Sequence, residues 1–143
     1  MRQSLTPSRR PADYPFRHRI RTRFAETDAM GVIHHAAYLP YLEEARVEYL
    51  RDIGFPYEEV RKAGIDFAVL EISLQYKAPL HFDEEVDVHL RAGAATRATF
   101  QIAYLLTVGD EIRATGVTVH GCVGEGGRAA RLPSWVGEVF ADK

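Results

Sequence analysis

The sequence predicts an α+β domain in which one long helix lies on an antiparallel sheet. The order of the patterns is the first reason: a short alternating segment, then a long segment with helical spacing, then alternating segments almost to the C-terminus. The second is that short turns separate the alternating segments, which is typical of antiparallel strands with one covered face. The third is length, since 143 residues are enough for one domain with a substantial core.

The elements follow from these patterns in order. Arginines alternate with other side chains near the start of the chain, which predicts a first strand at 18–26. A long helix is expected at 35–53, followed by a short helix at 56–62. Pro40 is tolerated only in a first turn, which favours a start near Ala37. The apolar stripe of the long helix has spacings of three and four residues. It consists of Tyr38, Leu42, Ala45, Tyr49 and Ile53, and is widened by Leu39 and Leu50.

Everything after Gly64 has the period of strands. The even positions of the first of these segments are apolar, from Leu70 to Tyr76, and are expected to face the core. A hairpin is expected at the turn Gly109-Asp110. The four predicted strands are 68–78, 86–91, 98–108 and 112–123. A loop at 124–131 and a terminal helix at 133–141 complete the chain.

Composition limits the partners and the location. Residues 1–15 are rich in proline and small polar residues, which predicts a flexible tail before a single domain at 16–143. Residues 1–23 hold seven arginines and one acid, but a solvated strand face is favoured over a phosphate-binding row, and no nucleic-acid partner is expected. No apolar run is long enough for a transmembrane segment.

Cys122 is the only cysteine in the sequence. It is expected to be a buried structural thiol, and a single cysteine is compatible with a cytoplasmic location.

One stretch carries groups suited to chemistry. Asp28 is followed by Gly31 and then by His34 and His35, where the long helix is expected to begin. The free N–H groups and positive dipole end of a helix N-terminus suit an anion or a polarised carbonyl oxygen. A carboxylate beside such a site is the minimum equipment for hydrolysis of an acyl derivative.

Other interpretations of these residues stay open. Asp28 could simply shape a turn through its local backbone. Glu43 is a rival carboxylate, although a helix charge paired with Arg46 at i+3 is favoured. His34 and His35 are adjacent and expected to point in different directions, so no metal site and no cofactor are predicted. The remaining histidines lack ligand spacing and are interpreted as surface or sheet residues.

The same residues resemble a known family. The run from Phe24 to Tyr38, followed by Glu43-Glu44-Ala45-Arg46, resembles the signature of hotdog-fold acyl-CoA thioesterases. It is closest to the 4-hydroxybenzoyl-CoA thioesterase family, including the branch associated with the Tol–Pal envelope system. Residues 76–80 and Asp83-Glu84 resemble the exit of that family's second strand. The similarity covers about 20–133.

The resemblance implies a hotdog fold, in which a five-stranded antiparallel sheet wraps one long helix. It also implies at least a dimer, with each site between the helix of one subunit and strands of the other. The catalytic carboxylate falls on Asp28, and the backbone N–H of His35 would polarise the thioester carbonyl. Candidate substrate-binding residues are Gly31, Val32, Tyr38, Phe67 and Val69. Phe24 stands where many members of the Tol–Pal branch carry tyrosine, so one hydroxyl is missing.

The expected function is hydrolysis of acyl-CoA thioesters, with Asp28 as general base or as nucleophile. Two alternatives remain: a non-catalytic module that binds acyl thioesters, and a hydrolase acting on acyl carrier protein. A hotdog dehydratase is not favoured because the His-Phe-Pro type of signature is absent. The acyl preference and the choice between homodimer and homotetramer stay open at this point.

Overall fold

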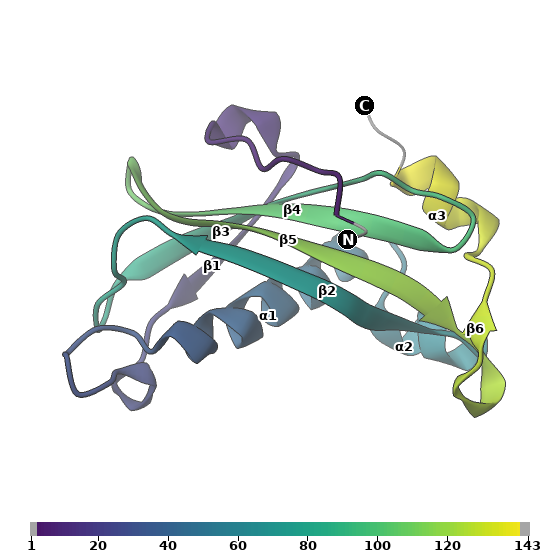
Figure 1. Ribbon diagram of the computed structural model, residues 1–143, viewed down its shortest axis with the longest axis horizontal. Coiled ribbons are helices and arrows are strands. Elements are labelled where there is room, and N and C mark those ends of the chain that lie inside the picture. The colour runs from purple at the N-terminus through teal and green to yellow at the C-terminus, as the bar shows by residue number, and fades with distance from the viewer. Residues whose placement is uncertain (1–2, 141–143) are drawn as a thin grey trace.

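A computed structural model describes residues 3–140 and shows a long helix held in the curve of one sheet (Figure 1). Short 3₁₀ turns connect several of the elements. In chain order the elements are η1 (Pro11–Asp13), β1 (Phe16–Arg21), η2 (Phe24–Glu26), η3 (His35–Ala37), α1 (Tyr38–Asp52), α2 (Tyr57–Lys62), β2 (Asp66–Tyr76), β3 (Glu85–Gly93), β4 (Thr99–Val108), β5 (Glu111–Val123), η4 (Glu125–Gly127), β6 (Ala129–Ala130) and α3 (Ser134–Val139).

The sheet is antiparallel, with strand order β1-β3-β4-β5-β2 and the short β6 paired with the end of β5. The predicted α+β architecture is therefore confirmed, with six strands in place of five. The sixth strand has only two residues and lies in the segment predicted as a loop. Two residues are too few to show an alternation in the sequence. The predicted terminal helix is present as α3 and ends at Val139; residue 141 of that prediction lies outside the described part.

The long helix is present but begins later than 35. His35–Ala37 forms the separate turn η3, and α1 starts at Tyr38. Pro40 is thus the third residue of α1, where no intrahelical N–H bond is lost. Gly54, with φ 90°, lies just beyond the end of the helix. No helix in 3–140 is long and apolar enough to cross a membrane.

The stripe of α1 packs on the inner face of the sheet as predicted. Tyr38, Leu42, Ala45 and Tyr49 are all buried and belong to the main core cluster, together with inward-facing residues of β3 and β4. Leu50 is also buried. Leu39, which the sequence predicts to widen the stripe, is instead exposed and lines an open surface hollow beside Val69 and Ile72 of β2. The end of the core near β6 holds Cys122, which is 3% exposed, and burial raises the pKa of its thiol.

Strand β1 ends at Arg21, not at 26. The Thr22 N–H donates to the Glu84 carbonyl oxygen at 2.9 Å, and the Thr22 hydroxyl donates to the His81 carbonyl oxygen at 2.6 Å. These bonds tie the chain to the segment before β3, and it then turns into η2. The prediction of strand structure through 26 is therefore wrong, since alternation of residue type continues past the last ladder bond.

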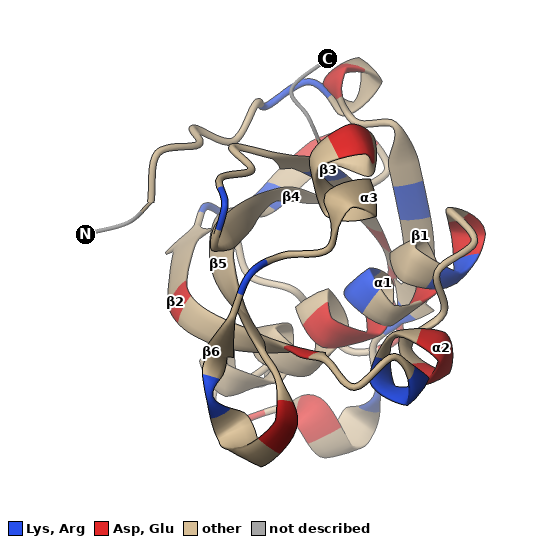
Figure 2. Cartoon of the chain, turned by 90° about the vertical axis from the view of Figure 1, so that its right-hand side faces the viewer, with Lys and Arg blue, Asp and Glu red and all other residues tan. Residues whose placement is uncertain are grey.

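The arginines of β1 lie on a solvated face, as expected (Figure 2). Arg19 Nε donates to Asp87 Oδ1 of the neighbouring strand at 2.9 Å. Arg21 pairs with Asp83 and Glu85. Because acids of the adjacent strand neutralise these cations, the row is not a free phosphate-binding surface.

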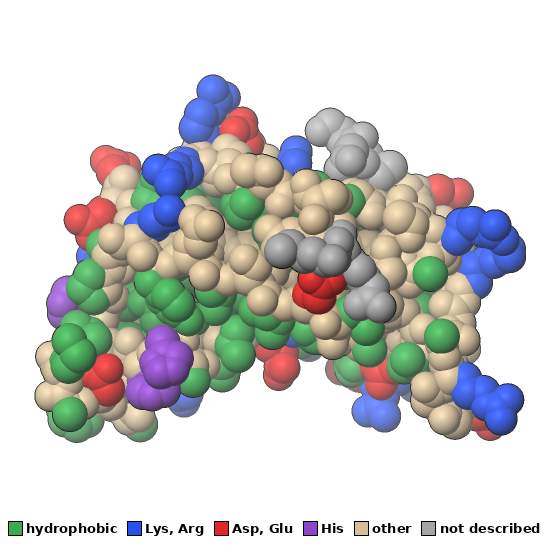
Figure 3. Space-filling view, in the orientation of Figure 1, with side chains coloured by type: hydrophobic (Ala, Val, Ile, Leu, Met, Phe, Trp, Pro, Cys, Tyr) green, Lys and Arg blue, Asp and Glu red, His purple; other side chains and the backbone are tan. Residues whose placement is uncertain are grey.

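Strand β2 forms one edge of the sheet and leaves apolar side chains exposed. Its register with β5 shifts between Val69 and Glu71, which interrupts the alternation. Leu70, Ile72 and Tyr76, predicted to face the core, are exposed. Figure 3 shows apolar side chains on this side of the molecule, near the histidines. Within 3–140 no strand pairs with the outer edge of β2, so this edge is open to another chain.

Residues 3–15 cross the outer face of the sheet, over β4 and β5 (Figure 1). Tyr14 is buried there and clusters with Leu105 and Leu5. The N–H of Leu5 donates to Gln101 Oε1 at 3.1 Å. The flexibility expected for this tail stays a prediction, but its residues have defined contacts.

Candidate active site

Asp28 lies in a tight turn between η2 and η3. Its N–H donates to the Val32 carbonyl oxygen at 2.8 Å, and the Gly31 N–H donates to the Asp28 carbonyl oxygen at 3.0 Å. Gly31 has φ 81°, a left-handed conformation that favours glycine. The Met30 N–H donates to Asp28 Oδ1 at 2.8 Å. The second oxygen, Oδ2, has no hydrogen-bond partner among the described residues. One oxygen therefore shapes the turn, while the other is available.

The Asp28 turn is held by the segment that follows β2. The Ile33 N–H donates to the Leu80 carbonyl oxygen at 2.8 Å. Val32 forms an isolated β-bridge with His81. The position of the Asp28 carboxylate thus depends on the position of residues 80–81.

Arg113 of β5 braces that segment. Its Nη1 donates to the Pro79 carbonyl oxygen, and its two Nη atoms donate to the two oxygens of Glu84, all at 2.8 Å. Glu84 Oε1 also accepts the His81 N–H at 2.6 Å. Hydrogen bonding to the guanidinium lowers the pKa of Glu84 to about 2. This ion pair connects the sheet to the backbone that holds the Asp28 turn.

His34 and His35 lie where the chain enters the helix. His34 Nδ1 accepts the Ala36 N–H at 3.0 Å and caps η3. Their rings stack with centroids 4.1 Å apart, so the expectation that they point in different directions is wrong. The His35 N–H has no acceptor among the residues described, as is usual for the first N–H of a helical turn. No group of three or more His, Cys, Asp or Glu in that part of the chain is arranged to hold a metal.

Asp28 and His35 line one open cleft of about 270 Å³. Its other walls come from the turn, the start of α1 and the end of β2: Val32, Ile33, Tyr38, Tyr76, Lys77, Ala78 and Pro79. Tyr38 is buried and meets the Tyr76 ring edge-on at 4.9 Å. The Tyr76 hydroxyl also donates to the His35 carbonyl oxygen at 3.1 Å. The structure thus brings Asp28, Val32, His35 and Tyr38 together, whereas Gly31 shapes the turn and does not line the cleft.

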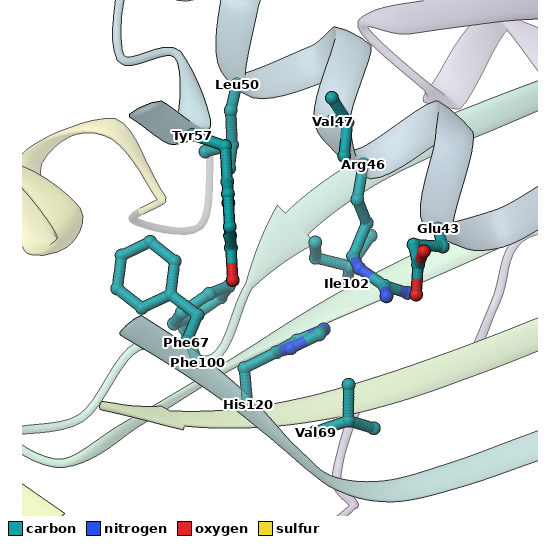
Figure 4. Close-up of a pocket in the computed structure, with 10 residues that line it drawn as sticks. All are labelled: Glu43, Arg46, Val47, Leu50, Tyr57, Phe67, Val69, Phe100, Ile102 and His120. Atoms are coloured by element: carbon teal, nitrogen blue, oxygen red, sulfur yellow. The ribbon is translucent and has the colours of Figure 1, made fainter. Parts of the chain in front are cut away.

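A second cavity, of about 260 Å³, lies between α1, α2 and the inner face of the sheet (Figure 4). It is lined by Glu43, Arg46, Val47, Leu50, Tyr57, Phe67, Val69, Phe100, Ile102 and His120. Phe67 and Val69, predicted to share a pocket with Tyr38, lie here instead. Within one subunit β2 runs from this cavity to the Asp28 cleft and places its two ends in different sites. The predicted pocket lies between subunits, so its shared lining by Phe67, Val69 and Tyr38 stays a prediction.

A chain of hydrogen bonds connects Arg46 and His120, two residues that line the second cavity. Arg46 Nη1 donates to the Tyr104 hydroxyl at 3.2 Å. The Tyr104 hydroxyl contacts Thr118 Oγ1 at 2.7 Å, which in turn contacts His120 Nε2 at 2.7 Å. Burial lowers the pKa of His120 to about 3, so this histidine is neutral at pH 7. Glu43 forms no ion pair within 3–140, so its expected pairing with Arg46 is wrong.

Five residues that line the cleft were missed as site residues: Ile33, Tyr76, Lys77, Ala78 and Pro79. They belong to the two runs that resemble the family, 24–38 and 76–80, so a signal was present in the sequence. Arg113 carried no such signal. It is one basic residue in an alternating strand, and its partners lie about 30 residues earlier in the chain.

Comparison with known proteins decides the family. The model of the thioesterase-like superfamily matches residues 22–140. The chain belongs to the thioesterase-like superfamily. This confirms the predicted hotdog thioesterase family, and relatives in it are named as thioester hydrolases.

Three known proteins show the extent of the similarity. A crystal structure of a hypothetical protein from Aquifex aeolicus has 40% identity and a TM-score of 0.84, covering 88% of this chain and 99% of that one. The acyl-CoA thioester hydrolase YbgC of Escherichia coli is 33% identical over 73 residues, which is 51% of this chain and 54% of that protein. The structure of a gentisyl-coenzyme A thioesterase has 25% identity and a TM-score of 0.80, covering 85% and 98%.

Proposed function

We propose that this member of the thioesterase-like superfamily hydrolyses acyl-CoA thioesters to a free acid and coenzyme A, with Asp28 as the catalytic carboxylate. The observation that carries the proposal is the free Oδ2 of Asp28 in a cleft that also presents the unpaired N–H of His35. Relatives named for hydrolysis of acyl-CoA or gentisyl-CoA support the same reaction class.

Asp28 promotes attack on the carbonyl carbon of the thioester by one of two routes. As a general base, it takes a proton from water while the water oxygen attacks the carbonyl carbon, and the tetrahedral intermediate then expels coenzyme A thiolate. As a nucleophile, it forms a mixed anhydride and expels coenzyme A thiolate, and water then hydrolyses the anhydride. In both routes the hydrogen bond from Met30 to Oδ1 holds the carboxylate so that Oδ2 faces the substrate.

His35 contributes through its backbone. Its N–H lies at the start of η3, directly before α1, where the helix dipole favours negative charge. It therefore stabilises the oxyanion that develops when the carbonyl is attacked, and removal of such a donor costs about 10²–10³ in rate. His34 supports this role because it caps the same turn.

The functional unit is a homodimer that pairs through β2. The exposed Ile72 and Tyr76 on the open edge favour such contact with a second copy. Pairing through this edge brings the Asp28 cleft of one subunit toward the helix and second cavity of the other. Phe67 and Val69 then take part in acyl binding from across the interface. No cofactor enters this reaction, and a cytoplasmic location stays a prediction.

The test is thiol release from a panel of acyl-CoA substrates. Asp28→Asn keeps the oxygen that accepts the Met30 N–H but removes the charge, and we expect kcat/KM to fall at least about a hundredfold. Asp110→Asn, in an exposed turn, is the matched control and is expected to retain activity. A burst of thiol ahead of acid release indicates the anhydride route, whereas simultaneous release indicates the general base.

Two results would overturn the assignment. Equal activity of Asp28→Asn and wild type would move the chemistry to Glu43 or another group. An inactive wild type across the panel would leave an acyl carrier protein substrate or a binding module, which the same assay with acyl carrier protein thioesters then separates.

A further inference from the structure

The second cavity contains a buried histidine that uses only one of its two ring nitrogens. His120 is 2% exposed, and its Nε2 contacts Thr118 Oγ1 at 2.7 Å. Its Nδ1 has no hydrogen-bond partner among the described residues. In that part of the chain, Arg113 Nε is the only fully enclosed side-chain nitrogen or oxygen without a partner. The Nδ1 atom is therefore not enclosed, and the space open to it is the cavity that the ring lines (Figure 4).

The chain of hydrogen bonds that ends at His120 has a defined direction. The Arg46 guanidinium has donors only, and its Nη1 donates to the Tyr104 hydroxyl at 3.2 Å. Tyr104 is 0% exposed, and the only acceptor near its own hydroxyl proton within 3–140 is Thr118 Oγ1, at 2.7 Å. The Thr118 hydroxyl proton is then directed to His120 Nε2. This ring nitrogen is thus an acceptor and carries no proton.

The proton of His120 therefore lies on the nitrogen that faces the cavity. Burial, together with the charge of Arg46, lowers the pKa of His120 to about 3, so the ring is neutral at pH 7. A neutral imidazole with its acceptor at Nε2 carries its one proton on Nδ1. Glu43 is the only carboxylate in the cavity lining, and it is exposed and makes no hydrogen bond to this N–H.

The surroundings of this N–H are apolar and hold the ring in one orientation. The His120 ring stacks on Phe100 with centroids 5.0 Å apart and an angle of 16° between the planes. Phe67 meets Phe100 edge-on at 5.1 Å. The Tyr57 hydroxyl, the other neutral polar group of the lining, donates to Asp66. A fixed donor among apolar walls favours a ligand with an acceptor at that point, because a hydrocarbon that fills the cavity leaves the donor unpaired.

We propose that His120 determines the acyl specificity of the second cavity by donating a hydrogen bond from Nδ1 to a carbonyl oxygen within the acyl chain. The preferred substrates are oxoacyl-CoA thioesters, in which a ketone interrupts an otherwise apolar chain. This inference rests on the proposed function, in which the second cavity receives the acyl group of a thioester held at the partner subunit's Asp28.

The experiment compares kcat/KM, measured by thiol release, within pairs of substrates of equal chain length. Each pair consists of an oxoacyl-CoA, with its ketone at the fourth, fifth or sixth carbon, and the parent acyl-CoA. For at least one pair we expect the wild type to favour the oxoacyl-CoA by about tenfold, since the parent leaves the donor unpaired.

Three variants test whether His120 causes this preference. His120→Phe keeps a ring that stacks on Phe100 but removes the donor, and is expected to abolish the preference. His120→Asn places an amide N–H at the position of Nδ1 and is expected to retain part of it. His89→Phe is the matched control, because His89 is also buried and bonded to a threonine but does not line the cavity. It is expected to keep the full preference.

Each outcome decides either this inference or the proposed function. Hydrolysis with equal kcat/KM within every pair would overturn the role of His120 and leave the proposed function intact, as would a preference that persists in folded His120→Phe. If that variant does not fold, the wild-type ratio and His120→Asn give the answer. Inactivity toward every substrate would overturn the proposed function. Calorimetric binding of the same pairs to Asp28→Asn, which should leave the thioesters intact, then tests the preference apart from turnover.

Discussion

Glu84 offers the sharpest test of how the Asp28 turn is held. Glu84→Gln keeps the size of the side chain but removes the charge that faces Arg113. A lowering of the pKa from 4.5 to about 2 corresponds to roughly 3 kcal/mol. Solvent screens part of this because a fifth of the side chain is exposed, so about 1–2 kcal/mol of stability is expected to be lost at pH 7.

The pH dependence follows from the same pair. The folded-state pKa lies below the unfolded value, so the stabilisation is complete above about pH 4.5 and disappears as pH falls toward about 2. Urea denaturation of both proteins at pH 7 and near pH 2.5 measures this change. The control is Glu85→Gln, whose pairs with Arg19 and Arg21 are exposed and worth less than about 0.5 kcal/mol. Equal stability at pH 7, or a difference that persists at the low pH, would refute the reasoning.

The remaining predictions concern the interface and the buried polar chain. Ile72→Lys places a charge on the open edge of β2 and should halve the molar mass and abolish thioester hydrolysis, whereas Gln75→Lys, also exposed on β2, should do neither. An active Ile72→Lys monomer would disprove a shared site. Thr118→Val removes the partner of His120 Nε2 and leaves the Tyr104 hydroxyl with Arg46 alone, and it should cost about 1–3 kcal/mol in thermal or urea unfolding. A loss below about 0.5 kcal/mol would mean that the two side chains find other partners.

Much of the fold could be predicted because its signals are local. The stripe of α1 was identified residue by residue, apart from Leu39, since helical spacing sets which side chains share a face. The course of β2 could not be predicted in the same way. The alternation of β2 is visible in its sequence. The register shift at Leu70 and the position of β2 at the edge depend on which strands pair, and the sequence of one strand does not determine its partners.

In the candidate site, too, contacts between residues near in sequence could be predicted, whereas contacts between distant residues could not. Asp28 and His35 share a cleft, as the motif indicates, because they lie within one short turn. Phe67 was assigned to a pocket with Tyr38, yet within one chain it lines another cavity. Arg113 meets Glu84 only through the ladder between β5 and its neighbours. Such a contact depends on tertiary structure, which a single sequence does not reveal.

The burial of Cys122 has a practical consequence for measurements on this protein. Thiol-specific reagents react with thiolates, and the only thiol of the chain is inaccessible and has a raised pKa. A chromogenic reagent added to the folded enzyme therefore titrates released coenzyme A with little background from the protein. Without substrate, the rate at which the same reagent modifies Cys122 reports how often the end of β5 near α3 and β6 opens. The burial of one side chain therefore lowers the background of the activity assay and allows local unfolding to be measured.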